Sequence, residues 1–287
     1  MATARDRTIQ PISRADDLLG WPGGQPYLTS DVAASDVAFG CLAVDLAGAT
    51  RSVAFIRTPS ADRDHPWITA LGDPGDVEIL VEHLLNEHGE VNDGGLVGGA
   101  TVPASIRTQL SQRLLSRTPP IRWGTTDQGA PWDWWWASEV RLDEPAAHEV
   151  IWLDAFDPTT ADAIRTLLAV ASPTHWAPPE HPHVTRWAGI VDQHGAVLAC
   201  VAETLRIPGH PHLASVATHP DHRGRGMAVA VTGWMTQELL AEGAPLVSLG
   251  MYAHNDIARR VYTRLGYTCA YSWFSSGFAS IPASERC

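Results

Sequence analysis

Two glycines in a short arginine-containing turn constrain this chain more than any other feature. The turn, Arg223 to Ala228, follows an apolar run from Leu213 to Thr218 and precedes apolar residues at helical spacing. Glycine lets a backbone approach a ligand closely, and the first N–H groups of a helix have no acceptor within it. This order predicts a phosphate site, with added charge from Arg223 and Arg225. A tight strand-to-helix connection without a ligand is the alternative.

A second motif lies downstream of this turn. Its pattern, N-x-x-A-x-x-x-Y-x-x-x-G-[FY], is filled by Asn255, Ala258, Tyr262, Gly266 and Tyr267. Residues 223–228 likewise fill the pattern [QR]-x-x-G-x-[GA]. With both motifs complete, residues 145–280 resemble the GNAT superfamily of acyl-CoA-dependent N-acyltransferases. The resemblance implies a three-layer α/β fold with a mixed sheet between helices.

The resemblance also implies that acetyl-CoA is the co-substrate, and it indicates which residues hold it. Backbone N–H groups of the turn would bind the diphosphate, and the strand before the turn would part from its neighbour to receive the pantetheine arm. A freed N–H in that strand would polarise the thioester carbonyl. The residues assigned in this way are Val216, Ala217, Thr218, Arg223, Gly224, Arg225, Gly226, Met227, Ala228 and Asn255, with Met227 contributing its backbone.

Tyr262 is the residue that the resemblance implies as the acid for the leaving thiolate. It lies two helical turns after Asn255, on the helix face shared with Ala258 and Leu265. A phenol with a pKa near 10 protonates a thiolate only where the site favours the transfer. A tyrosine that serves only in the core is the alternative. Asn255 would cap the helix and also contact the cofactor.

Two residues are candidates for the base that takes the proton of the amine. His212 occupies the strand position where the histone-acetylating branch has a glutamate, and an ordinary imidazole pKa near 6.5 suits a base. Glu203, on the neighbouring strand, is the second candidate. Gly250 stands where the branch that acetylates ribosomal-protein N termini has its glutamate, which counts against that branch. A surface histidine in a turn is the alternative for His212.

Charge and composition limit the partners. The formal net charge of -12 argues against nucleic acid as the main partner and fits a small-molecule amine acceptor weakly. The apolar runs are too short for a membrane span, and no signal peptide is visible, so we expect a cytoplasmic location. Four scattered cysteines and histidines in proline-containing turns predict neither a disulfide framework nor a metal site. The sequence does not indicate an oligomeric state.

A chain of 287 residues favours two domains. We expect residues 1–30 to pack loosely, residues 31–145 to form a non-catalytic α/β domain that ends in a linker, and residues 146–287 to form the GNAT-like domain. The first half is either a degenerate copy of the second or an unrelated α/β fold, and Gly98-Gly99-Ala100 is its nearest approach to a phosphate turn. Four tryptophans between Trp132 and Trp136 predict a seam between domains or a stacking surface for substrate.

The motifs together predict an N-acetyltransferase in which a bound amine attacks acetyl-CoA directly in a ternary complex. Two alternatives stay open. One is an acyl-CoA-binding module that does not catalyse and acts as a sensor or partner. The other is a mycothiol-synthase-like acyltransferase.

Overall fold

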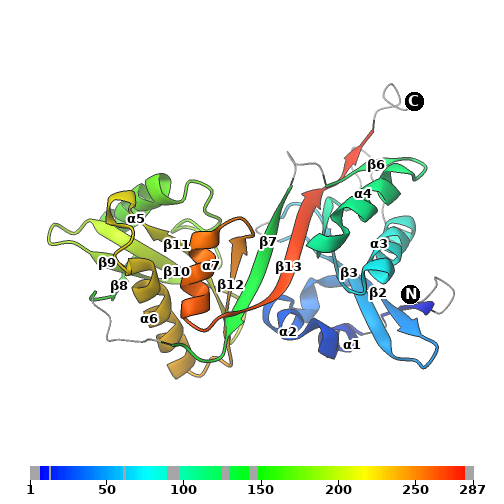
Figure 1. Ribbon diagram of the computed structural model, residues 1–287, viewed down its shortest axis with the longest axis horizontal. Helices are drawn as coiled ribbons and strands as arrows, with labels where there is room; N and C mark the ends of the chain where they lie inside the picture. The colour runs from blue at the N-terminus through cyan, green and yellow to red at the C-terminus, as the bar shows by residue number, and fades with distance from the viewer. Residues whose placement is uncertain are drawn as a thin grey trace. The chain divides into compact units, whose positions relative to one another are not determined.

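The computed structural model describes residues 7–12, 14–60, 63–88, 97–124, 129–141 and 148–281, which fold into two compact units (Figure 1). Unit 1 comprises Met1–Asp133, Tyr252–His254 and Tyr271–Cys287. Unit 2 comprises Trp134–Met251 and Asn255–Ala270. The unit boundaries therefore fall within three strands, namely β7 (Gly129–Ala137), β13 (Thr268–Gly277) and the end of β12 (Val247–Tyr252).

Unit 1 is built on strands in the order β1-β2-β3-β4-β5, followed by the end of β13. Neighbouring strands are antiparallel except β4 and β5, which are parallel. Its elements are β1 (Arg7–Pro11), α1 (Ala15–Leu19), α2 (Tyr27–Asp31), β2 (Val37–Asp45), β3 (Thr50–Arg57), β4 (Trp67–Gly72), α3 (Pro74–His88), β5 (Gly99–Pro103), α4 (Arg107–Leu115) and β6 (Ile121–Arg122).

Alternating side chains give the sheet of unit 1 two apolar faces. Ala54 and Ile56 of β3 belong to the core under α3 and α4, whereas Val53 and Phe55 point to the opposite face and are also buried. Helices α1 and α2 lie on that second side (Figure 1). We expected residues 1–30 to pack loosely. For α1 and α2 this expectation is wrong, because Leu18 and other apolar side chains of both helices are buried.

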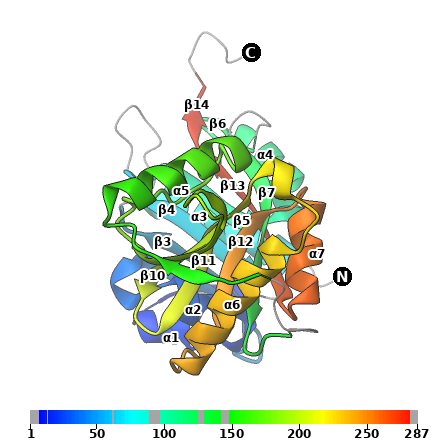
Figure 2. The ribbon, with the colours of Figure 1, turned by 90° about the vertical axis from the view of Figure 1, so that its left-hand side faces the viewer.

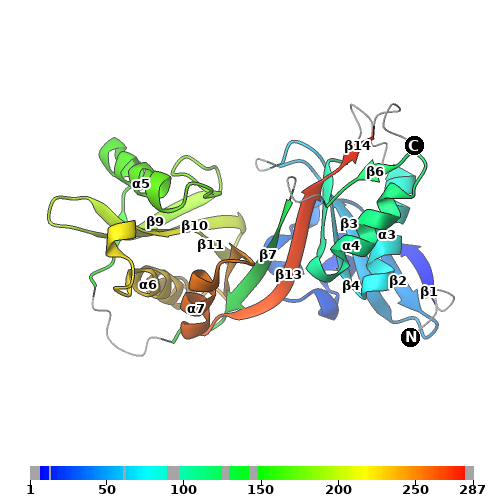
Figure 3. The same ribbon diagram turned by 45° about the horizontal axis from the view of Figure 1, so that its top comes forward.

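Unit 2 has the strand order β8-β9-β10-β11-β12, followed by the end of β7. Its elements are β8 (Ile151–Leu153), α5 (Pro158–Ala171), β9 (Val184–Val191), β10 (Val197–Ile207), β11 (His210–Thr218), α6 (Met227–Ala241), β12 (Val247–Tyr252) and α7 (Asp256–Arg264). Helix α5 covers one face of the sheet, while α6 and α7 cover the other (Figures 2 and 3). The predicted three-layer α/β fold is therefore confirmed for this unit.

The two units share one topology. In each, an antiparallel pair is followed by a parallel pair, β3-β4-β5 in unit 1 and β10-β11-β12 in unit 2. A helix follows the middle strand in both units, α3 and α6, and another follows the third strand, α4 and α7. This repetition favours a degenerate copy over an unrelated fold for the first half. Within the described residues, no helix is long and apolar enough to cross a membrane.

Several boundaries differ from those that the sequence predicts. The tryptophans of residues 132–136 lie in β7 and not in a linker, and the units divide after Asp133. Residues of β13 belong to both units, and the end of this strand pairs with β5 from Trp273 to Gly277. Trp123 reinforces this pairing, because its Nε1 donates to the Ser276 carbonyl at 2.9 Å. Such partners lie far apart in the sequence.

Two adjacent leucines at the end of α4 give a matched test of this packing. Leu114 is fully buried in the unit 1 core, whereas Leu115 is 45% exposed. We expect Leu114→Ala to lower the free energy of unfolding by about 2–5 kcal/mol, because the truncation leaves a cavity. Leu115→Ala should change it by less than about 0.5 kcal/mol. Denaturant titration measures both values, and equal losses would contradict the assignment of the core.

Candidate functional site

The turn between β11 and α6 has the backbone shape that close approach of a ligand requires. Gly224 and Gly226 have φ angles of 76° and 79°, in the left-handed region that favours glycine, and Gly226 is the N-cap of α6. A Cβ added at either glycine would meet no atom within 4 Å. Residues 223–226 are exposed, while the Met227 side chain is buried in the core of unit 2. The start of α6 therefore adjoins an exposed turn with free space around both glycines.

The two arginines of the turn brace its backbone. The Arg223 guanidinium donates to the carbonyl of Thr218 at 3.3 Å and to that of Ala171, at the end of α5, at 3.2 Å. Arg225 donates to the Asp221 carbonyl at 3.4 Å, and the His148 ring lies 2.6 Å from the carbonyl oxygen of Arg225. These contacts hold two positive charges beside the N-terminus of α6, where the helix dipole also favours an anion.

Strand β11 parts from β12 directly before this turn. Within residues 148–281, all of which the structure describes, the two strands pair only at His212 and Leu213. On its other edge, β11 carries a bulge, because Ser215 and Val216 together oppose a single residue of β10, Val201. Ser215 lies in the bulge with a φ of 52°, and its hydroxyl donates to the carbonyl of Ala177 at 2.6 Å. The parting that the resemblance implied is present.

The three residues after the bulge have distinct surroundings. Val216 lies against the core on the α6 side, and Ala217 belongs to the core on the α5 side. The hydroxyl oxygen of Thr218 is buried and has no hydrogen-bond partner among the described residues. A buried polar atom without a partner is costly, so its presence beside the parted strands fits a site that receives polar ligand atoms.

Tyr262 lies in α7 on the same side of the sheet as α6. Only 5% of the residue is exposed, and its ring centroid is 5.9 Å from that of Tyr267. Burial raises the pKa of the Tyr262 phenol, which keeps it protonated at neutral pH, the form that an acid needs. The hydroxyl of Tyr267, by contrast, hydrogen-bonds Thr236 at 2.7 Å. Asn255 caps α7, since its Oδ1 accepts from the Ala258 N–H at 3.0 Å.

The structure separates the two candidate bases. His212 pairs laterally with Thr204, whereas Glu203 pairs with Leu213, so the two side chains leave opposite faces of the sheet. The Nδ1 atom of His212 is 2.9 Å from the hydroxyl of Ser248, its paired residue on β12. His212 therefore lies one residue before the pairing of the two strands ends.

Glu203 is engaged elsewhere. It is buried, and its carboxylate accepts from Nε of Arg186 at 2.6 Å. Arg186 also binds Glu242 through two hydrogen bonds of 2.7 Å. Hydrogen bonds to Glu242 and Glu203 raise the pKa of Arg186. Because the Glu203 carboxylate is already held by Arg186, His212 is the better placed of the two.

Sequence reasoning missed Ser215 and Ser248. Neither belongs to a motif, and serine is common in strands, so no sequence signal indicates them. Ser248 lies beside His212 because of the parallel register of β11 and β12. Ser215 lies in a bulge that can be recognised only once β10 and β11 are paired. No group of three or more metal-binding side chains occurs in the part of the chain that the structure describes.

Unit 1 contains a counterpart of the glycine turn. It is not the segment Gly98-Gly99-Ala100, which the sequence indicated as the nearest approach to such a turn. By topology it is the turn between β4 and α3, and Asp76 occupies the first turn of that helix. The Asp76 side chain is fully buried and forms ion pairs with Arg7 and, at 3.7 Å, Arg51. Because a carboxylate of the chain itself occupies this helix N-terminus, the unit 1 turn does not offer an anion site.

Comparisons with known proteins agree with this geometry. The family model described as FR47-like protein matches residues 188–274. Mycothiol acetyltransferases of Nocardia farcinica and Frankia casuarinae are 33% and 41% identical over 131 and 73 residues. These regions cover 42% and 22% of this chain and only 41% and 20% of the relatives.

A solved GCN5-related N-acetyltransferase from Sphaerobacter thermophilus has a TM-score of 0.48 at 15% identity, over 97% of both chains. The family model matches the residues that contain both motifs, the bulged strand and the parted pair. The C-terminal half of this chain is therefore similar to the FR47-like family over residues 188–274, which contain both motifs of the GNAT resemblance.

Proposed function

We propose that this protein is an N-acetyltransferase that transfers the acetyl group of acetyl-CoA to an amine of a small molecule, by direct attack in a ternary complex. One observation carries the proposal. The open glycine turn at the N-terminus of α6 adjoins the place where β11 leaves β12. The turn suits a diphosphate, and the parted strands suit a pantetheine arm, so together they fit the two parts of one cofactor.

The residues that would hold acetyl-CoA are those of the turn and the bulged strand. Backbone N–H groups at the start of α6 would bind the diphosphate, with Arg223 and Arg225 supplying positive charge. Backbone groups of Val216 and Thr218 would pair with the pantetheine arm. When bound, the co-substrate supplies a thioester, whose carbonyl oxygen a backbone N–H of the same strand would stabilise as charge develops.

Two proton transfers complete the reaction. An alkylamine with a pKa near 10.4 is mostly protonated at pH 7, which costs on the order of 4–5 kcal/mol unless a base removes the proton. His212, positioned by Ser248 one residue before the pairing of the strands ends, would accept it. Tyr262 would protonate the leaving thiolate, since its burial keeps the phenol in the acid form.

A mycothiol-synthase-like acyltransferase is the second candidate. The similarity to two proteins named mycothiol acetyltransferase supports it, and so does the repeated topology of the two units. An amine-library screen that follows release of the CoA thiol distinguishes the candidates by the acceptor that is turned over. Acetyl-CoA binding by calorimetry, without thiol release for any acceptor, would instead favour a non-catalytic acyl-CoA-binding module.

Two glycines with nearly equal φ angles allow the effect of backbone strain to be distinguished from the effect of a Cβ that blocks the ligand. Gly226 and Gly195 have φ angles of 79° and 82°, and neither would place a Cβ near another atom. Alanine should therefore strain both turns by about 1–2 kcal/mol. We expect only Gly226→Ala to weaken acetyl-CoA binding as well, by at least about tenfold, because its Cβ would enter the space of the diphosphate. Calorimetric titration of both variants checks this, and equal affinities would refute the diphosphate site.

Removing the Tyr262 hydroxyl tests the acid. We expect Tyr262→Phe to lower kcat by about 10²–10⁴-fold while acetyl-CoA affinity stays nearly constant, because only the proton donor is lost. Tyr267→Phe is the matched control, since this second buried tyrosine hydrogen-bonds Thr236. Steady-state kinetics with the best acceptor from the screen provides the measurement. Full kcat in Tyr262→Phe would exclude the phenol as the acid.

The pH dependence of kcat/KM tests the base. A histidine base is active when neutral, so the rate should fall as the pH drops through its pKa, and His212→Ala should remove this acidic limb of the profile. Ser248→Ala should retain the limb but shift its midpoint, because the hydroxyl contacts the ring at Nδ1. An unchanged profile in His212→Ala would assign the proton transfer to another group or to water.

A further inference from the structure

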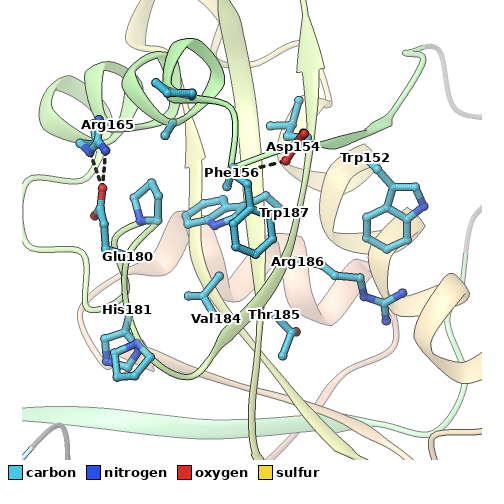
Figure 4. Close-up of a pocket in the computed structure, with 16 residues that line it drawn as sticks. Trp152, Asp154, Phe156, Arg165, Glu180, His181, Val184, Thr185, Arg186 and Trp187 are labelled. Carbon is cyan, nitrogen blue, oxygen red and sulfur yellow. Dashed lines mark hydrogen bonds and ion pairs between the residues drawn. The ribbon is translucent and has the colours of Figure 1, made fainter.

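A cavity of unit 2 lies at the edge of its sheet, where the chain turns from β8 into α5 (Figure 4). Its volume is about 770 Å³, within the range of small-molecule sites. The start of α5, the loop at residues 179–182 and the beginning of β9 complete its walls. It shares no lining residue with the glycine turn, the bulge or α7.

Three apolar aromatic rings line this cavity, in addition to the imidazole of His181. Trp187 is buried at 1% exposure, Trp152 is 40% exposed and Phe156 is 96% exposed. The Trp152 ring is held from two sides, by Trp234 at a centroid distance of 4.8 Å and by the Arg186 guanidinium at 4.7 Å. The Phe156 ring stays in contact with water unless a ligand covers it. Binding of a ligand at the rim would therefore bury apolar surface, which is favourable.

The charges around the cavity are predominantly negative. Both arginines of the lining are neutralised, Arg186 by Glu203 and Glu242, and Arg165 by Glu180 and Asp162. Asp154 also lines the cavity, and no described arginine or histidine forms an ion pair with it. Its Oδ1 accepts from the Phe156 N–H at 3.0 Å, which fixes the carboxylate beside the exposed ring. An uncompensated carboxylate beside aromatic faces attracts an organic cation.

We propose that this edge cavity is a binding site for an organic monocation, an ammonium group carried on an aromatic or aliphatic body. The ammonium lies against Asp154 and the face of Phe156, and the apolar body lies in the cavity above Trp187. The two guanidiniums shape the walls, and their carboxylate partners leave them no net charge to repel the ligand.

The edge cavity is distinct from the proposed acetyl-transfer site, although one loop contacts both. Residues 172–183 contribute Pro179 and Pro182 to the cavity and Ala177 to the hydrogen bond with Ser215 of the bulge. A test must therefore measure binding apart from turnover. A quaternary ammonium serves this purpose, because its nitrogen carries no proton and cannot be acetylated.

Calorimetry on the full chain with benzyltrimethylammonium tests the proposal. We expect this cation to bind one site, and benzyl alcohol and phenylacetate to bind at least about fivefold more weakly. Asp154→Asn removes the charge but keeps an oxygen for the Phe156 N–H, and it should weaken cation binding by about two- to fivefold. Phe156→Ala should weaken it similarly.

Two variants control for charge and surface effects. Asp17→Asn removes an exposed carboxylate in α1, and Leu46→Ala removes an 81% exposed apolar side chain. Both should bind the cation as the unmodified protein does, and saturating acetyl-CoA should not displace it. Equal affinity of Asp154→Asn and Asp17→Asn, phenylacetate binding as tightly as the cation, or no cation binding at millimolar concentration would each overturn the proposal.

Discussion

The parting of β11 from β12 is the constraint on which the rest of the site depends. A paired strand uses its backbone groups in the sheet, so an extended ligand arm has no edge to join. Here pairing stops after Leu213, and the bulge at Ser215 bends the strand on its other edge. The bulge is secured from outside the sheet, because the Ser215 hydroxyl donates to Ala177. The same bend directs the chain into the glycine turn that begins α6.

The two units indicate how one topology can support a site in one copy and not in the other. Both have a strand, a turn and a helix in the same place. In unit 2 the turn has left-handed glycines and an exposed helix N-terminus, whereas in unit 1 the helix N-terminus is occupied by buried Asp76 with its arginine partners. In unit 1 the Asp76 carboxylate itself supplies the negative charge that stabilises the N-terminus of α3.

Arginine pairing organises unit 2 beyond the turn. Arg186 joins β9 to Glu203 on β10 and to Glu242 after α6, and it also lies over Trp152. The same residue thus engages one candidate base and forms a wall of the edge cavity. Its ion pairs therefore favour His212 over Glu203 as the base, and they leave Arg186 without excess positive charge at the cavity wall.

The sequence by itself determined the elements that depend on neighbours along the chain. Helical spacing after the glycine turn predicts α6, the Asn255 cap predicts the start of α7, and the two motifs fix the glycine turn and the place of Tyr262. Tertiary structure alone decided which strands meet. The end of β13 joins β5, and His212 meets Ser248, because hydrogen bonds between strands depend on register and not on local sequence. The bulge, the engagement of Glu203 and the closure of the unit 1 turn by Asp76 arise in the same way, from contacts between residues that the sequence keeps apart.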